Sequence, residues 1–334
     1  MTESYDFQWI GSPLDPNSSD PEIELVKQEI YRMDPAGTKF AGVIRDTLDQ
    51  LYDGQRTGRW SFDQLYKTEK THMGTLVEIN LQRCFAFADG DATDYRIAGI
   101  EVDCKYSMKP GEWTLPPEVV GRIALVVTAN DQQSVWSAGL VRVRSEYLRS
   151  GRNRDQKSSL TAAARSHITW LWGNQNLLAK NLFLHLDSAD RDRIFAARSQ
   201  RGNQHGQARV NELFRSVHRR VIRRAELATV AQQDDFMKRA RSNGGARDKL
   251  RPEGILVLGH QECDTVVADA LGLPVPQVGE FVAVRVAPTS PLGYRRSVNI
   301  RGEWWAVADE QDEVTPAPII ERRADVRGVS SGRR

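Results

Sequence analysis

The sequence predicts an α/β fold organised in two domains, and three observations lead to this prediction. The chain has 334 residues, a usual length for two domains. Residues 100–108 alternate apolar and polar side chains with period two, and residues 123–128 and 139–143 form short apolar runs, so strands are predicted at all three. Apolar residues at helical spacing dominate on both sides of these segments. We expect a central mixed sheet flanked by helices, followed by a second domain that opens with helices.

The predicted elements set the domain boundaries. Residues 1–20 contain several Pro, Asn and Ser and are expected to be loosely ordered, and helices are expected at 22–33 and 40–53. We place the first domain at 21–170, a linker at 171–180, the second domain at 181–322 and a flexible tail at 323–334. In the second domain we predict helices at 207–224, 232–241 and 264–271, a glycine-rich turn at 242–247, and strands at 254–259 and 280–286. Helices followed by a short hairpin favour a winged helix-turn-helix arrangement.

Two aspartates and a lysine form the pattern that points most directly to chemistry. Asp103 and Lys105 project from the same face of the predicted strand as Glu101, because side chains two residues apart point the same way. Asp94 precedes a bend expected at Gly99, so a hairpin could bring it back beside Asp103. Two carboxylates at one point suit Mg²⁺, and a neighbouring ammonium could orient or deprotonate an attacking water or stabilise charge at phosphorus. This D-(x)n-D-x-K pattern is typical of metal-dependent phosphodiesterases.

A third carboxylate, Glu78, lies on a helix predicted over residues 70–82. The apolar stripe of that helix consists of Met73, Leu76, Val77 and Leu81. Glu78 lies off the stripe. It is therefore either a further metal-binding carboxylate ahead of the hairpin or a solvated surface charge.

The segment 51–56 suggests a different enzyme class. It resembles the K-x-D-G nucleotidyl-transfer motif of ATP-dependent DNA ligases, in which a lysine attacks the α-phosphate. Leu51 stands in the lysine position and cannot form a phosphoramide, so an adenylating enzyme is disfavoured. The alternative interpretation is structural: Val43, Ile44, Leu48 and Leu51 form the apolar face of a helix that ends at Asp53-Gly54.

Several long runs of the chain resemble the NaeI-type restriction endonucleases, whose first domain has the PD-(D/E)xK fold. The runs are residues 51–60, 67–81, 201–214, 228–239 and 250–255, and the similarity extends from about Thr38 to about Pro318. The resemblance implies that Glu78, Asp94 and Asp103 are metal ligands and that these three act with Lys105 in catalysis. The motif's proline is replaced here by Thr93, which puts nothing in doubt because that proline has no chemical role.

The same resemblance implies more about function. It implies an effector-stimulated (type IIE) enzyme that uses Mg²⁺, cuts both DNA strands at GCCGGC with 5′-phosphate and 3′-hydroxyl ends, and works as a homodimer. It also implies a second domain that binds a further copy of the recognition site, and a cognate DNA methyltransferase as functional partner.

The distribution of charge agrees with a polyanionic partner, although the net charge of the chain is only +2. Residues 201–251 contain thirteen Lys or Arg against five Asp or Glu, a local net charge of +8. The alternative is an ordinary solvated helix face. The candidate DNA contacts are Arg209, Arg219, Arg220, Lys238, Arg239, Arg247 and Lys249.

The three cysteines, Cys84, Cys104 and Cys263, show no metal-ligand spacing, and Cys84 and Cys104 lie in apolar contexts where burial is expected. Together with the absence of an apolar leader or a membrane-length apolar run, this favours a cytoplasmic protein. Two alternatives to a restriction endonuclease remain: a DNA-binding protein with an inert nuclease site, and a repair enzyme that nicks one strand.

Overall fold

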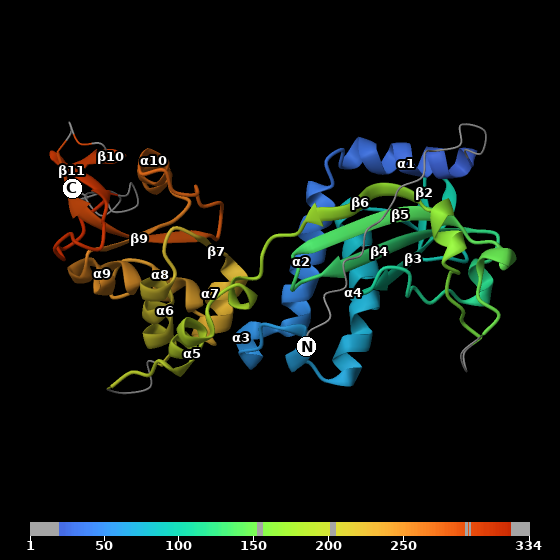
Figure 1. Cartoon of the computed structure of the whole chain (residues 1–334), viewed down its shortest axis with the longest axis horizontal. Helices are drawn as coiled ribbons and strands as arrows, with labels where there is room; N and C mark the ends of the chain where they lie inside the picture. Colours follow the sequence, from blue (N-terminus) through green and yellow to red (C-terminus); the bar gives the residue numbers. More distant parts are fainter. Residues whose placement is uncertain (1–19, 152–155, 201–204, 291–292, 294, 322–334) are drawn as a thin grey trace, which may run out of the picture. The chain divides into compact units, whose positions relative to one another are not determined.

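The computed structural model of the protein describes residues 20–151, 156–200, 205–290, 293 and 295–321 (Figure 1). The expectations for residues 1–19 and 323–334 lie outside this range. The chain divides into two compact units. The first contains the chain up to Tyr52 together with Ser61–Leu184, and the second contains Asp53–Trp60 together with the chain from His185 onward. None of the described helices is long and apolar enough to cross a membrane.

A six-stranded sheet forms the centre of the first unit, with the strands in sequence order. The strands are β1 (Ala88–Asp89), β2 (Tyr95–Ile97), β3 (Ile100–Ser107), β4 (Ile123–Asn130), β5 (Val135–Arg142) and β6 (Thr169–Leu177). Strands β3 and β4 are parallel, and the other neighbours are antiparallel. The sheet is therefore mixed, as the sequence predicts.

The two faces of this sheet are covered differently. Helices α1 (Pro21–Met33), α2 (Thr38–Tyr52) and α4 (Lys67–Phe85) share one large core with the sheet, to which β3 contributes Val102 and Cys104. Loops and 3₁₀ turns cover the opposite face around the fully buried Trp113. The 3₁₀ turns of this unit are Phe62–Gln64, Pro117–Val119, Ser145–Tyr147, Ala163–His167 and Leu182–Leu184. Because strand side chains alternate, Asp103, which lies between Val102 and Cys104, points away from the core that β3 shares with the helices.

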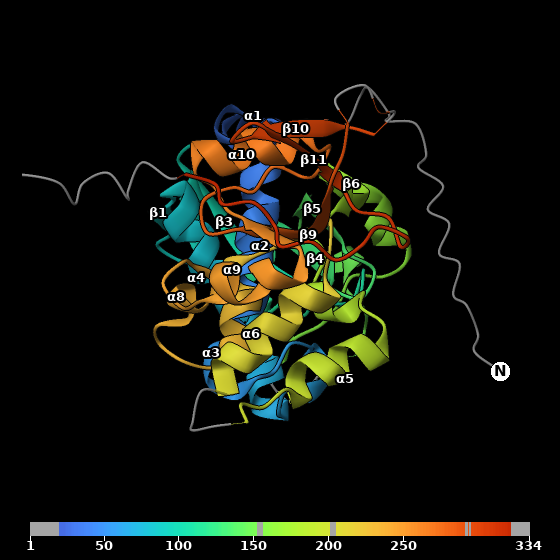
Figure 2. The same cartoon turned by 90° about the vertical axis from the view of Figure 1, so that its left-hand side faces the viewer.

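The second unit combines a helical cluster with an antiparallel sheet of order β10-β11-β9-β7, in which β8 also pairs with β9. Its strands are β7 (Val221–Ile222), β8 (Ile255–Leu258), β9 (Phe281–Pro288), β10 (Ser297–Ile300) and β11 (Glu303–Val307). Its helices are α3 (Gly54–Thr57), α5 (Ser188–Ala196), α6 (His205–Ser216), α7 (Arg224–Ala231), α8 (Phe236–Ala240), α9 (Ala246–Leu250) and α10 (Glu262–Ala270), with a 3₁₀ turn at Arg251–Glu253. Helix α10 lies on one side of β9 and helices α6, α8 and α9 lie on the other (Figures 1 and 2).

Three expectations are wrong. The helix predicted over 207–224 ends at Ser216, because the backbone turns at Arg219 (φ 60°) and pairs as β7 with β9. Most of the predicted linker 171–180 belongs to β6, whose register shifts hide its alternation from sequence inspection. Cys84 is exposed near the end of α4, whereas Cys104 is buried as predicted.

The ligase-like segment, residues 51–56, begins with residues that have a structural role. Leu51 is buried in the core of the first unit, as the structural interpretation predicts. Helix α2 ends at Tyr52, and Asp53 takes the left-handed conformation. Gly54 then belongs to the second unit, where a Cβ atom would lie 2.0 Å from Thr229 Oγ1 on α7, so only glycine fits there.

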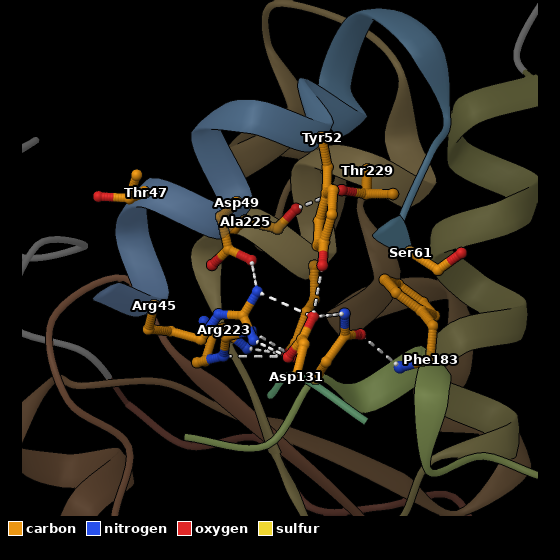
Figure 3. A network of polar contacts seen from close by, with 12 residues as sticks. Arg45, Thr47, Asp49, Tyr52, Ser61, Asp131, Phe183, Arg223, Ala225 and Thr229 are labelled. Carbon is orange, nitrogen blue, oxygen red and sulfur yellow. Dashed lines mark hydrogen bonds and ion pairs between the residues drawn. The ribbon is translucent and has the colours of Figure 1, made fainter. Parts of the chain in front are cut away.

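A buried network of polar contacts lies at the turn between β4 and β5 in the first unit (Figure 3). The buried Asp131 carboxylate forms a salt bridge with Arg45 and accepts hydrogen bonds from Tyr52 (2.6 Å) and Asn181 (3.0 Å). Arg45 also pairs with Asp49 at 2.8 Å. Both oxygens of Asp131 therefore have donors.

Candidate active site

A tight hairpin brings the predicted site residues together. Ile97 pairs with Ile100, so only Ala98 and Gly99 form the turn, and both have positive φ (51° and 80°). This is the geometry of a mirror-image turn, which the right-handed twist of the strands favours. Tyr95 pairs with Val102, and Asp94 comes immediately before β2, so it returns beside Asp103. The bend predicted at Gly99 is confirmed.

Lys105 lies between the two aspartates. Its Nζ is 2.7 Å from Asp103 Oδ2 and 3.5 Å from Asp94 Oδ2, and it donates to the Cys104 carbonyl at 2.8 Å. Asp94 Oδ2 accepts the backbone N–H of Cys104 at 2.7 Å, which ties this carboxylate to β3. The structure therefore brings Asp94, Asp103 and Lys105 to one point on the sheet.

The environment shifts the proton affinities of these groups. Burial raises the pKa of Asp103 to about 6, and Lys105 opposes this rise. Burial lowers the pKa of Lys105, but the charges of Asp103 and Asp94 outweigh burial and raise it above its ordinary value. Burial also raises the pKa of the Cys104 thiol to about 12, so this cysteine remains an uncharged core residue. Perturbed carboxylates of this kind concentrate at functional sites.

Glu78, on helix α4, interacts electrostatically with Asp94, Lys105 and Asp103, but no direct contact joins it to them among the described residues. It is half-buried, and burial together with the charge of Asp94 raises its pKa. Tyr95 donates a hydrogen bond from its hydroxyl to the Glu78 carbonyl at 2.7 Å, so the residue after Asp94 fixes this turn of the helix. The stripe of α4 is buried at Met73, Val77 and Leu81, as predicted.

The donor set fits a divalent cation without forming a closed cage. No group of three or more His, Cys, Asp or Glu side chains within the described part of the chain has the spacing of a metal site. Mg²⁺, however, usually keeps several waters and takes one or two carboxylates from a protein. Asp103 Oδ2 is buried and accepts no hydrogen bond of normal geometry, although Lys105 Nζ is close to it. A buried carboxylate oxygen with spare capacity beside Asp94 is suited to such an ion.

Glu101 is the residue that the sequence interpretation left without a role. It shares the face of β3 with Asp103, which was visible in the alternation of the sequence. Its carboxylate accepts hydrogen bonds from the backbone N–H groups of Asp91, Ala92 and Thr93. The hydrogen bonds from the Asp91 N–H, the Thr93 hydroxyl and the Ala92 N–H lower its pKa to about 2. The structural contact across the hairpin could not be read from spacing alone.

The seven candidate DNA-binding residues of the second unit fall into two groups. Arg209 is buried and donates to the carbonyls of Val230 and Ala231 at the end of α7, and Arg247 pairs with the buried Asp264 at 2.6 Å. These two guanidinium groups are therefore structural. Arg220 and Arg239 are half-buried, and Arg219, Lys238 and Lys249 are exposed.

A cleft that the sequence did not reveal lies on the first unit, with a volume of about 830 Å³. Among the described residues, its wall carries the cations Arg149 and Lys157 and no acidic side chain. The lining residues are Thr114, Leu148, Arg149, Ser150, Gly151, Lys157, Ser158, Ser159 and Thr161. Hydroxyl groups and cations of this kind match phosphate oxygens.

Comparison with known proteins defines the class of this chain. The family model for restriction endonuclease NaeI matches residues 24–316. The type II restriction enzyme NaeI of Lentzea aerocolonigenes is 57% identical over 312 residues, which cover 93% of this chain and 98% of that enzyme. The protein is a type II site-specific deoxyribonuclease. It belongs to the NaeI restriction endonuclease family, as its sequence runs suggested.

Proposed function

We propose that this enzyme cleaves both strands of DNA at GCCGGC in a Mg²⁺-dependent reaction. The identity of 57% to a named type II restriction enzyme supports a shared recognition site. The observation that carries the chemistry is the position of Lys105 Nζ, within 3.5 Å of carboxylate oxygens of both Asp94 and Asp103. A carboxylate pair can hold a divalent cation, and an adjacent ammonium can orient water or stabilise charge at phosphorus, so this arrangement supports hydrolysis of a phosphodiester.

The chain's own residues have distinct roles in this proposal. Asp94 and Asp103 would hold the metal, and Glu78 would position a metal or its water. Mg²⁺ held there would supply charge neutralisation at the phosphate and a more acidic water. Lys105 orients or activates that water for in-line attack and stabilises the charge that develops on the phosphate oxygens. The backbone N–H of Cys104 holds the Asp94 carboxylate during the reaction.

The second unit is proposed to bind a further copy of the recognition site and so to stimulate cleavage. A winged helix-turn-helix arrangement is proposed for this unit, with its helices followed by β8 and β9. Lys238 lies in the last turn of α8, and Lys249 lies near the end of α9; both are exposed. They and Arg219 are the candidates for phosphate contacts. Arg209 and Arg247 are not, because the fold occupies them.

A homodimer is proposed because a palindromic site is matched by two-fold protein symmetry. A cell that contains this enzyme must protect its own GCCGGC sites, so a DNA methyltransferase with the same specificity is proposed as its functional partner. The cleft with Arg149 and Lys157 is proposed to contact the backbone of the cleaved duplex.

The decisive test is cleavage of supercoiled plasmids with one or two GCCGGC sites, in Mg²⁺ and in EDTA. The proposal expects Mg²⁺-dependent fragments ending at GCCGGC, and faster cleavage of a one-site plasmid when a duplex with the site is added. Fragments ending elsewhere would discard the site and keep the class. A nicked circle as final product would favour a repair enzyme, and retarded but intact DNA would favour a binding protein.

A further inference from the structure

Glu101 holds the segment that leads into the Asp94 side of the site. Asp91 N donates to Oε1 at 2.9 Å, and Ala92 N and Thr93 N donate to Oε2 at 3.1 Å each. The Thr93 hydroxyl adds a fourth hydrogen bond at 2.8 Å. One carboxylate therefore accepts three consecutive backbone N–H groups, and the next residue in the chain is Asp94.

Cationic side chains fix the Glu101 carboxylate in turn. Arg96, its cross-strand partner in the hairpin, donates to Oε1 at 3.1 Å and also pairs with Asp91. Arg122 approaches Oε2 at 3.7 Å. The Glu101 side chain is 25% exposed, so these contacts act in a partly desolvated setting where they are stronger than in water.

The strand itself sets the geometry. Glu101 and Asp103 are two residues apart on one face of β3. The same strand therefore carries the site carboxylate Asp103 and also Glu101, which holds the backbone segment that leads to the second site carboxylate, Asp94. Asp94 is fixed from both sides: from the Cys104 N–H on its carboxylate and from Glu101 on the preceding backbone. A carboxylate pair that must share one ion needs such support, because displacement of about 1 Å can cost two orders of magnitude in rate.

We infer that Glu101 is a positioning residue for phosphodiester hydrolysis: it holds the turn of residues 91–93 so that Asp94 stays aligned with Asp103. This inference rests on the proposed roles of Asp94 and Asp103 in binding Mg²⁺. Glu101 does not touch substrate or metal, and its effect reaches the reaction through Asp94.

The test compares Glu101→Gln and Glu101→Ala in the full-length enzyme with Glu29→Gln as matched control. Glu29 lies on α1, is 31% exposed and pairs with Arg32 at 2.8 Å, so its change removes a similar carboxylate elsewhere in the same unit. Single-turnover cleavage is measured across Mg²⁺ concentrations, together with metal-free DNA affinity and melting temperature.

We expect both Glu101 variants to need about tenfold more Mg²⁺ for half-maximal rate and to cleave about 10- to 100-fold more slowly at saturation. Metal-free DNA affinity should change less than about twofold, and Glu29→Gln should match the parent. Thr93→Ala, which removes only one donor, should shift the Mg²⁺ dependence in the same direction by a smaller factor.

Two results would overturn the inference. One is unchanged Mg²⁺ dependence in Glu101→Ala; the other is a loss of rate that follows melting temperature alone. Full activity in Asp94→Asn would instead refute the proposed function, so the two failures are distinguishable.

Discussion

The first unit contains two groups of charged side chains, around Asp131 and around Asp103, that differ in how fully their carboxylate oxygens are hydrogen-bonded. Around Asp131, Arg45, Tyr52 and Asn181 give both carboxylate oxygens a donor. Around Asp103, one buried oxygen accepts no well-formed hydrogen bond, and a second carboxylate, Asp94, stands on the other side of Lys105. The Asp131 carboxylate therefore has a donor for each oxygen, although Arg45 Nε has no acceptor among the described residues, whereas the Asp103 carboxylate keeps an oxygen without a well-formed hydrogen bond.

This difference separates charge that maintains the fold from charge kept available for a ligand. A buried ion pair is tolerable when its remaining lone pairs are satisfied, and removal of one partner then costs several kcal/mol. A buried carboxylate oxygen that lacks a hydrogen-bond donor destabilises the folded chain until a ligand binds to it. The raised pKa of Asp103 reflects this unfavourable burial of charge. Mutations in the two groups should therefore separate stability from activity.

The largest effect is expected from Asp103→Asn. This change keeps the shape of the side chain but removes the charge that faces Lys105, so cleavage should fall by about 10³-fold or more. The free energy of unfolding should stay the same or rise, because a poorly solvated charge is removed. Single-turnover cleavage and urea denaturation measure the two quantities. If the Asp103→Asn variant lost stability together with activity, the distinction between charge that maintains the fold and charge available to a ligand would be wrong.

Asp131→Ala should show the reverse pattern. It leaves Arg45 and Tyr52 buried without their main acceptor, and the expected loss of stability is about 3–5 kcal/mol. The double variant Arg45→Met with Asp131→Leu should recover part of this loss. At a temperature where each protein is folded, cleavage should remain within about tenfold of the parent. A stable Asp131→Ala protein would contradict this interpretation of the network.

The two groups also show what the sequence could predict. Strand alternation and a turn glycine placed Asp94, Asp103 and Lys105 together, because period two and hairpin geometry are local properties. Local patterns could not predict that Asp131 meets Arg45, 86 residues away, or that Arg219 turns the chain into β7. These depend on tertiary contacts, which also override the helical pattern after Ser216.

Net charge along a segment was the weakest guide, since it cannot show which cations the fold occupies. Arg209 and Arg247 contributed to the basic count of residues 201–251, yet backbone carbonyls and Asp264 hold them. The same distinction between structural and available charge therefore applies in the second unit. It can be tested there through the salt dependence of DNA binding.

Lys249→Ala should reduce the slope of log affinity against log salt concentration by about 0.9, the value for one phosphate contact. Arg209→Met should leave that slope unchanged and instead cost about 1–3 kcal/mol of stability, because two α7 carbonyls lose their donor. Binding titrations at several salt concentrations, with a duplex containing the site, measure the slope. An equal change of slope in both variants would refute the division of these cations.

The smallest effect is expected at the surface pair of Asp20 and Arg142, which bond at 2.7 Å with about a quarter of each side chain exposed. The Arg142 hydrogen bond lowers the pKa of Asp20. A lowered folded-state pKa means that the carboxylate stabilises the fold above its unfolded pKa of about 3.9 and that this contribution is lost as pH falls through the folded-state pKa. The Asp20 side chain also caps α1 by accepting hydrogen bonds from the backbone N–H groups of Glu22 and Ile23. Asp20→Asn keeps this capping oxygen but removes the charge, so it should cost about 1 kcal/mol or less at pH 7. The difference in unfolding free energy between parent and variant should shrink below about pH 4. If the difference in unfolding free energy persists in acid, the stabilisation comes from hydrogen bonding and not from the charge of Asp20. The Asp20–Arg142 pair would then differ from the Asp131–Arg45 salt bridge, in which charge is expected to stabilise the fold.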